Sequence, residues 1–271
     1  MSFSNFSNKI VWITGASTGI GEAIAHSFAQ QGAQLVLSAR NTEKLNVVAE
    51  KCLMLGASKT WVIPIDLAKP ESIEQAVISY DFSVGKTLDI LVNNGGVSQR
   101  SLVDETDMNV YRQLMEVNYF GTIALTKAML PYLKANTNSS IITISSVAGK
   151  LGTPLRSGYA ACKHALHGFF DSLRAEVYKN NMQVLLVCPG YIRTNVSVNA
   201  LNAQGNSTGT MDKNQSDGMP PEILAQKILN AVKAGKQEIY VGGKEILGIY
   251  IKRFFPKLLN KIVRKQVNET A

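Results

Sequence analysis

Short apolar runs alternate with longer segments of helical periodicity along almost the whole chain. The runs are rich in Val and Ile and are apolar on both faces, which is typical of strands buried inside a parallel sheet. Segments between them, such as 20–31 and 109–134, place apolar residues three and four positions apart, as one face of a helix does. The runs expected to form strands are 9–14, 34–38, 60–64, 88–92, 140–145, 183–187 and 237–241.

Seven predicted strands that alternate with helices indicate an α/β fold. Such a chain forms a doubly wound (Rossmann) parallel sheet with right-handed crossovers, and its ligand lies beyond the carboxyl ends of the strands. We predict a single domain over 1–243, followed by a basic helical tail over 244–271. The polar, glycine-rich stretch 205–218 indicates a mobile loop at about 195–220, either a plain surface loop or a lid over a site.

The first predicted strand runs into a glycine-rich turn, Thr14-Gly-Ala-Ser-Thr-Gly-Ile-Gly21, and a helix follows. Gly15 allows a sharp turn, Gly19 allows the backbone to approach a phosphate, and Gly21 allows the helix to pack against the strand. The helix N-terminus then offers free N–H groups to a pyrophosphate. A tight turn without a ligand is the alternative, but the position between the first strand and helix favours a nucleotide.

Composition adds a question about charge. The chain of 271 residues is 45% apolar, which excludes a disordered protein, and its 28 basic and 20 acidic side chains give a net charge of +8. Residues 1–243 hold 21 basic and 18 acidic side chains, whereas residues 244–265 hold seven basic and one acidic, and Glu269 removes one charge. The excess charge therefore belongs to the tail, and outside the tail no basic patch with interleaved aromatic residues predicts a nucleic-acid partner.

Cysteines and histidines supply no obvious chemistry. Cys52, Cys162 and Cys188 are widely spaced and odd in number, so we expect no disulfide framework and no metal site. His26, His164 and His167 are interpreted as packed or surface residues, and Cys162 as a small packing residue. No apolar run of about 18 residues exists and the N-terminus lacks a signal-peptide pattern. These features predict a cytoplasmic protein, at most peripheral to a membrane.

Several motifs fall in one order along residues 14–194, and together they resemble the short-chain dehydrogenase/reductase family. They are the Gly-x3-Gly-x-Gly turn, Asp66-Leu67, Asn93-Asn-Gly-Gly96, Asn118, Ser145-Ser146, Tyr159-x3-Lys163 and Pro189-Gly190-x3-Thr194. Four longer runs, 145–150, 159–166, 169–176 and 189–200, are similar to the dehydrogenase/reductase member 7 and 7B branch. Members of that branch are associated with lipid-like carbonyl compounds and usually begin with a membrane-anchoring helix. This chain begins directly at its first strand, so we do not carry that anchor over.

The resemblance implies a catalytic constellation. Tyr159 would donate a proton to a substrate carbonyl oxygen while a hydride from NADPH reaches the carbonyl carbon. Ser146 would hydrogen-bond that oxygen, and Lys163 would favour the tyrosine phenolate and bind the nicotinamide ribose. Asn118 would hold a water that relays protons to Lys163. Because all four positions are intact, we expect an active enzyme rather than a cofactor-binding regulatory protein without turnover.

The resemblance also assigns cofactor contacts. Asp66 would accept from the adenine amino group, the backbone of 93–95 would pass over the adenosine ribose, and Thr194 would hold the carboxamide. The predicted cofactor-binding residues are Gly15, Ser17, Thr18, Gly19, Ile20, Gly21, Arg40, Asp66, Leu67, Asn93, Gly95, Tyr159, Lys163, Pro189, Gly190, Ile192 and Thr194.

The end of the second strand indicates which nicotinamide cofactor is used. Ala39 stands where NAD-dependent members carry an acidic residue, and Arg40 follows it. A guanidinium group can bind a 2′-phosphate through two hydrogen bonds, so NADP is favoured over NAD. An ordinary exposed arginine is the alternative, and the second basic residue that some NADP-dependent relatives carry at the position of Thr18 is missing.

The substrate pocket is expected from 97–100, 147–156 and the segment after Thr194. Its apolar residues (Leu151, Pro154, Leu155, Tyr191, Val196, Val198, Ala200 and Leu201) favour a hydrophobic or amphipathic carbonyl substrate. Membership of the family would further imply a homodimer or homotetramer.

The tail is amphipathic. From Phe255 onward, Phe255, Leu258, Leu259, Ile262 and Val263 share one side of a helical wheel, and Arg253, Lys257, Lys261, Arg264 and Lys265 share the other. Such a helix lies on an anionic membrane surface, or it docks its apolar side on the domain or on a second subunit. A protein that acts on membranes mainly through this tail is a second alternative to an enzyme.

Overall fold

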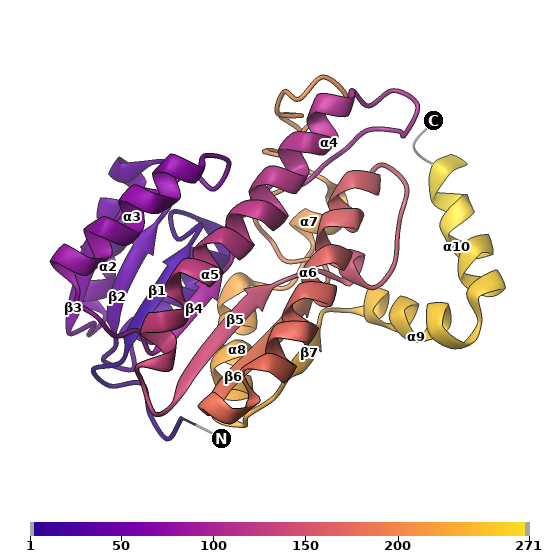
Figure 1. The fold of residues 1–271 in the computed structure, drawn as a ribbon. Coiled ribbons are helices and arrows are strands. Elements are labelled where there is room, and N and C mark those ends of the chain that lie inside the picture. The colour runs from indigo at the N-terminus through magenta and orange to yellow at the C-terminus, as the bar shows by residue number, and fades with distance from the viewer. Residues whose placement is uncertain (1–2, 269–271) are drawn as a thin grey trace.

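The computed structural model describes residues 3–268, with side chains described through residue 264. Seven parallel strands form one sheet in the order β3-β2-β1-β4-β5-β6-β7 (Figure 1). Their bounds are β1 Ile10–Thr14, β2 Gln34–Ser38, β3 Lys59–Val62, β4 Ile90–Asn93, β5 Ser139–Ile144, β6 Met182–Pro189 and β7 Glu238–Val241. The predicted doubly wound sheet is confirmed, and its strand ends differ from the expected ones by at most two residues.

Helices cover both faces of this sheet. They are α1 Gly19–Ala29, α2 Thr42–Met54, α3 Pro70–Ser83, α4 Met108–Met115, α5 Gly121–Lys134, α6 Ser157–Glu176, α7 Lys213–Ser216, α8 Pro221–Lys233, α9 Leu247–Phe254 and α10 Pro256–Asn268. Short 3-10 turns follow β5 (η2, Val147–Gly149), α6 (η3, Tyr178–Asn180) and β7 (η4, Lys244–Ile246). Buried side chains of α1, α2 and α8 form the core on one face, and those of α3, α5 and α6 form it on the other.

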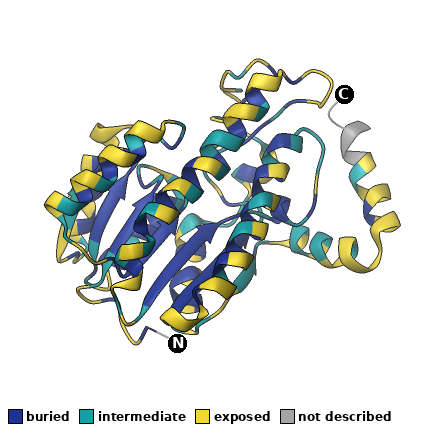
Figure 2. Ribbon diagram, viewed as in Figure 1, coloured by how far each residue is buried: buried dark blue, intermediate teal, exposed yellow. Residues whose placement is uncertain are grey.

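Successive side chains of a strand point to opposite faces of the sheet, so one short apolar run contributes to the cores on both faces. In β1, Val11 and Ile13 point to the α1 side, whereas Trp12 between them points to the α3 side, and all three are fully buried. Figure 2 shows the central strands as the most deeply buried part of the molecule. Because β1 pairs with both β2 and β4, the order of strands reverses there, and a ligand site is expected at that edge.

The segment predicted as one helix over 109–134 contains a turn of π-helix. This turn, η1 (Glu116–Phe120), joins α4 to α5. Within it, the side-chain amide of Asn118 donates to the carbonyl oxygen of Leu114 at 3.0 Å and to that of Val97 at 3.0 Å. The Asn118 side chain thus donates to a carbonyl oxygen, that of Leu114, that would otherwise accept a backbone N–H within the helix. Single π-turns of this kind occur frequently at functional sites.

After β7 the chain leaves the sheet and forms α9 and α10, which we call the C-terminal arm (247–268) (Figure 1). Leu259 is buried against Val147 and Leu151, with Ile251 and Val263 partly buried beside it. Helix α10 lies within the segment predicted as the tail, and of its described side chains Leu259 is buried on the domain and Val263 is partly buried. Within residues 3–268, no helix combines the length and apolarity that crossing a bilayer requires.

Candidate active site

One cavity of about 1320 Å³ opens at the carboxyl ends of the strands, over the position where the strand order reverses. The glycine-rich turn and the end of β2 form one end of it. The residues after β4, β5 and β6, together with the start of α6, form its middle. The C-terminal arm contributes Leu247, Ile251, Leu259, Ile262 and Val263 to the far wall. A cavity of this size exceeds that of an ordinary single-ligand site and is large enough for a dinucleotide and a substrate together.

Nearly all residues predicted to bind a cofactor or to act in catalysis line this cavity. The exceptions are Gly21 and Asn93, which lie behind the lining: Gly21 packs on the turn, and the buried Asn93 amide donates to Thr126 Oγ1 at 2.9 Å. The predicted residues on the lining are Gly15, Ser17, Thr18, Gly19, Ile20, Arg40, Asp66, Leu67, Gly95, Asn118, Ser146, Tyr159, Lys163, Pro189, Gly190, Ile192 and Thr194.

The glycine turn is an open cradle. Gly15 has a φ of +64°, and a Cβ atom there would lie 2.8 Å from Asn94 Nδ2. A Cβ atom on Gly21 would collide with the carbonyl oxygen of Gly15. Thr18 precedes α1 without a side-chain capping hydrogen bond, so the first N–H groups of the helix are left for a ligand. These features fit the pyrophosphate of a dinucleotide.

Basic side chains gather at the β2 end of the cavity. Arg40 is exposed and lines it, as does Lys44 one helical turn further on. The backbone N–H of Lys44 donates to Asn41 Oδ1 at 2.8 Å, which fixes the start of α2 beside the cavity. Sequence reasoning looked for a second basic residue at the position of Thr18 and missed Lys44. The signal was present, because Lys44 lies in the first turn of the helix that Asn41 caps and so stays close to the end of β2.

Tyr159 and Lys163 lie one turn apart on α6, with Lys163 Nζ 5.6 Å from the centre of the tyrosine ring. The lysine is 5% exposed, and its ammonium group donates to the carbonyl oxygen of Ile144 at 2.8 Å. Ser146 Oγ accepts from the backbone N–H of Ala148 at 3.1 Å. Hydrogen bonds to the backbone therefore hold two of the predicted catalytic groups at the end of β5.

The start of α6 is held by a residue that sequence reasoning placed only in the pocket wall. Gln99 is fully buried, and its Oε1 accepts from the backbone N–H groups of Gly158 at 2.8 Å and Tyr159 at 3.3 Å. Its Nε2 donates to Ser101 Oγ at 3.2 Å. Because first-turn N–H groups have no partner inside a helix, this side chain serves as a distant cap that orients the tyrosine.

A second polar cluster lies directly behind the catalytic residues. His167, one turn after Lys163, is 3.0 Å from Ser145 Oγ through Nε2 and 3.8 Å from Glu238 Oε1 through Nδ1. Cys188 Sγ lies 3.5 Å from the same carboxylate, which Lys150 also contacts at 2.7 Å. Burial, followed by the charge of Lys150, lowers the pKa of His167 to about 4, so the imidazole is neutral near pH 7. Its packed position agrees with the sequence interpretation; its partners were not foreseen.

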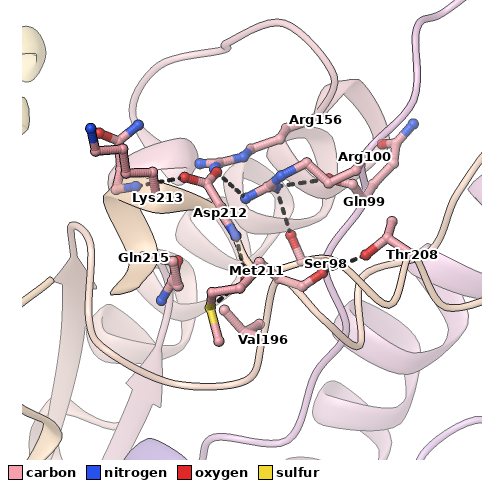
Figure 3. Close-up of polar contacts among 12 residues, drawn as sticks. Ser98, Gln99, Arg100, Arg156, Val196, Thr208, Met211, Asp212, Lys213 and Gln215 are labelled. Atoms are coloured by element: carbon pink, nitrogen blue, oxygen red, sulfur yellow. Dashed lines mark hydrogen bonds and ion pairs between the residues drawn. The ribbon is translucent and has the colours of Figure 1, made fainter. Parts of the chain in front are cut away.

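The substrate side of the cavity is less uniformly apolar than expected. Of the predicted apolar residues, Leu151, Tyr191, Val196 and Leu201 line it, whereas Pro154, Leu155, Val198 and Ala200 do not. Two arginines also line it, Arg100 and Arg156, and both contact Asp212 (Figure 3). Asp212 belongs to the loop between β6 and α8, and sequence reasoning gave it no role because its partners are more than 50 positions away.

Comparison with protein families gives a match over most of the chain. The model of the short chain dehydrogenase family matches residues 9–205. A dehydrogenase/reductase SDR family protein 7-like of Drosophila melanogaster is 42% identical over 262 residues, which cover 95% of this chain and 80% of that protein. The dehydrogenase/reductase SDR family member 7B of Mus musculus is 37% identical over 266 residues, covering 97% and 82%.

Two solved structures of similar fold are complexes with NADPH or a modified NADP. L-sorbose reductase from Gluconobacter frateurii, complexed with NADPH and L-sorbose, superposes with a TM-score of 0.78 at 25% identity, covering 89% of this chain and 98% of that one. An alcohol dehydrogenase from the archaeon Thermococcus sibiricus, complexed with 5-hydroxy-NADP, gives a TM-score of 0.75 at 25% identity, covering 88% and 97%.

Proposed function

Because the chain belongs to the short-chain dehydrogenase/reductase family and is thus an oxidoreductase, we propose that it uses NADP(H) to interconvert a carbonyl group and a secondary alcohol on a hydrophobic or amphipathic substrate. One observation carries the proposal: a single cavity is lined by Ser146, Tyr159 and Lys163 and also by the glycine-rich cradle. The intact catalytic set argues against a regulatory protein that binds a cofactor without turnover.

Within this proposal the chain's own groups handle the proton and the developing charge. When bound, NADP(H) supplies the chemistry of hydride transfer at the carbonyl carbon. Tyr159 donates its phenolic proton to the carbonyl oxygen, and Ser146 Oγ hydrogen-bonds that oxygen as charge develops on it. Lys163, held by Ile144 beside the tyrosine ring, stabilises the resulting phenolate through its positive charge.

The proton is returned to Tyr159 through Lys163 and a water near Asn118. Both hydrogens of the Asn118 amide are engaged, with Val97 and Leu114, and its Oδ1 accepts from the Val97 N–H at 3.0 Å. A water there would therefore have to donate to a main-chain carbonyl at the π-turn or to the remaining lone pair of Asn118 Oδ1. Lys163 Nζ, with one hydrogen on Ile144, retains others for the relay.

The preference for NADP rests on charge at the adenosine end. Arg40 and Lys44 line the cavity there, and 38–41 contains no acidic residue. A 2′-phosphate brings negative charge that two cations attract, whereas an unphosphorylated ribose gains little from them. The NADPH and 5-hydroxy-NADP complexes of the two similar structures support the same choice.

The experiment that tests the proposal measures oxidation of NADPH and NADH with a panel of apolar and amphipathic ketones and aldehydes. We expect turnover with NADPH in preference to NADH. Replacing Tyr159 by Phe should leave NADPH affinity unchanged and lower kcat at least about 100-fold, because general acid catalysis is lost. A variant with most of its kcat would refute the role of Tyr159, and preference for NADH would refute that of Arg40.

The C-terminal arm supports a further proposal about partners, contact with an anionic membrane surface. Several of its apolar side chains are exposed, and it carries basic residues without an acidic one between Glu245 and Glu269. The exposed apolar residues of the arm are Leu247, Tyr250, Phe254, Phe255, Leu258 and Ile262. Lys265 and Glu269 lie beyond the described side chains.

Homo-oligomerisation stays a prediction from family membership.

A further inference from the structure

Two arginines of the substrate side share one carboxylate (Figure 3). Arg100 Nη2 lies 3.0 Å and Arg156 Nη2 lies 3.3 Å from the same oxygen of Asp212, Oδ2. The other oxygen, Oδ1, accepts from the backbone N–H of Asn214 at 2.9 Å. Two guanidinium groups thus share one oxygen of the Asp212 carboxylate, because the other oxygen accepts a backbone hydrogen bond in the local turn.

The cluster has an unmatched positive charge in a poorly solvated place. The side chains of Arg100 and Arg156 are only 16% and 18% exposed. Burial, followed by repulsion from Arg156, lowers the pKa of Arg100 from its ordinary value, which indicates that the positive charge is incompletely compensated. Across residues 3–264, Asp212 is also the sole hydrogen-bond acceptor of the Arg156 guanidinium, so several of its N–H groups have no protein partner.

These free donors face the cavity that contains the catalytic tyrosine. Arg156 precedes α6 immediately and stands three positions before Tyr159, and both line the cavity, as does Arg100. The Arg156 guanidinium lies over the ring of Tyr191, 5.6 Å from its centre, which fixes its orientation. The acidic residue on this side, Glu245, already accepts from the backbone N–H groups of Tyr191 at 2.9 Å and Gly243 at 3.0 Å.

We propose that Arg100 and Arg156 bind an anionic group, a carboxylate or a phosphate, on an amphipathic carbonyl substrate, and that Asp212 occupies this pair when no such substrate is present. Planar guanidinium groups bind both anions through paired hydrogen bonds. The apolar portion of the substrate then lies toward Leu151 and the arm residues of the far wall. This inference rests on the proposed function, which places a carbonyl beside Tyr159.

Displacing Asp212 couples substrate binding to the loop between β6 and α8. The backbone N–H of Asp212 donates to Ser197 Oγ at 3.2 Å, and Gln215, three positions later, donates to the carbonyl oxygen of Ile192. Ile192 and Thr194, two positions further on, line the cavity and are among the predicted cofactor contacts. An anion that binds Arg100 and Arg156 in place of Asp212 therefore breaks the ion pairs that help to hold this loop.

The test uses calorimetry to measure how ligands without a ketone or aldehyde group bind to the enzyme with NADPH, and the ligands are decanoate, decyl phosphate and methyl decanoate. We expect at least one anion to bind about tenfold more tightly than the ester, as hydrogen bonds to charged groups provide. Added salt should weaken the binding of the anions but not the binding of the ester. The two anions distinguish a carboxylate site from a phosphate site. Equal affinity for all three ligands would overturn the proposal.

Variants separate an anion site from a purely structural ion pair. Arg156→Gln should remove the anion preference while affinity for methyl decanoate stays unchanged, and Arg112→Gln, an exposed arginine on α4, is the matched control. Asp212→Asn should raise anion affinity because the internal competitor is lost. If Asp212→Asn instead weakens all three ligands equally, the cluster only holds the loop and the proposal fails. The salt dependence of the unmodified protein decides the matter if Arg156→Gln does not fold.

The outcome is independent of turnover. If decanoate binds through Arg156 but no carbonyl compound is reduced, the proposed function fails and the anion site stands. If ketones are reduced with NADPH but decanoate, decyl phosphate and methyl decanoate bind with equal affinity, the enzyme assignment stands and the anion site fails.

Discussion

Two adjacent serines at the end of β5 have different partners, and their difference explains how the catalytic group is held. Both serines line the cavity, but Ser145 is buried and its Oγ lies 3.0 Å from His167 Nε2, whereas Ser146 Oγ accepts from the backbone N–H of Ala148. Successive residues of an extended segment point to opposite sides, so one serine anchors the strand end to α6 and the next is presented to a ligand. The neutral imidazole of His167 therefore holds Ser145, the residue next to the catalytic serine, while Ser146 Oγ itself is held by the backbone N–H of Ala148.

Buried His167 predicts a dependence of stability on pH. The pKa of His167 in the folded protein, about 4, lies below the ordinary value of 6.5, so the unfolded chain takes up a proton first as the pH falls. Stability should decline from about pH 6.5 and level off near pH 4, by roughly 3 kcal/mol from this group. Urea unfolding of the wild-type protein and of His167→Gln at several pH values measures the difference.

The substitution His167→Gln keeps a polar group near Ser145 but removes the titration. The variant should be less stable at pH 7.5 and should lose less stability on acidification than the wild type. His164→Gln, an exposed histidine on the same helix, is the control and should follow the wild type. Parallel curves for His167→Gln and the wild type would contradict the prediction. The charged neighbours that face His167, Lys150 and Glu238, remain in both proteins.

At this scale the sequence predicts residues whose chemistry is carried by local motifs, and it misses those that act through distant partners. Tyr159 and Lys163 are recognisable because one helical turn joins them. Gln99 caps α6 from 59 positions away, and Asp212 reaches Arg100 across 112 positions. Neither pairing has a local pattern, so only the fold reveals it.

Among the elements, the C-terminal arm is helical as predicted, but the extent of its contact with the domain is not indicated by its sequence. A basic amphipathic pattern predicts a helix with one apolar side, but it does not say how much of that side is covered. The arm buries Leu259 against Val147 and Leu151 and leaves Leu258 half exposed, although the two leucines are adjacent. The arm is thus both a wall of the cavity and an uncovered surface.

A substitution at Leu259 should affect the substrate and spare the cofactor. In Leu259→Glu a carboxylate replaces a buried leucine, which detaches the arm from η2 because an unpaired buried charge is costly. We expect the KM for an apolar ketone to rise about tenfold, as the loss of one or two kcal/mol of apolar contact implies, with the KM for NADPH unchanged. Steady-state kinetics without lipid measure both constants.

Leu258→Glu is the matched control, since it adds the same charge at the neighbouring exposed position. It should leave both constants close to those of the wild type. Equal effects of the two substitutions would show that the arm acts through its charge rather than by closing the cavity.

Considered as a whole molecule, the protein has a nearly balanced body and a strongly basic arm. The positions of charge are read directly from the sequence, and so is the amphipathic pattern. Which apolar side chains stay uncovered depends on how the arm docks, and docking is a tertiary contact without a local signature. Within residues 247–264 the arm packs some apolar side chains on the domain and leaves others exposed, and contact with a membrane surface stays a prediction.

The proposed membrane contact predicts sedimentation with vesicles that contain phosphatidylserine, and weaker sedimentation with pure phosphatidylcholine. Salt should reduce the binding because the basic residues act through their charge. Phe254→Ser should weaken it about tenfold, since an exposed phenylalanine gains roughly 1.5 kcal/mol or more on burial. Phe82→Ser, on α3, is the control, because Phe82 is 91% exposed and far from the arm in sequence. Equal binding to both vesicle types would contradict the charge argument.

The far wall of the cavity has a further consequence through the order of synthesis. Residues 247–263 leave the ribosome after the sheet, the glycine-rich cradle and the Tyr159–Lys163 pair have all been made. All residues of the cofactor cradle have therefore been synthesised before the segment that forms the far wall of the cavity. It also means that substrate preference can diverge between related proteins through changes in this short stretch alone, while every residue that carries the chemistry is left as it is.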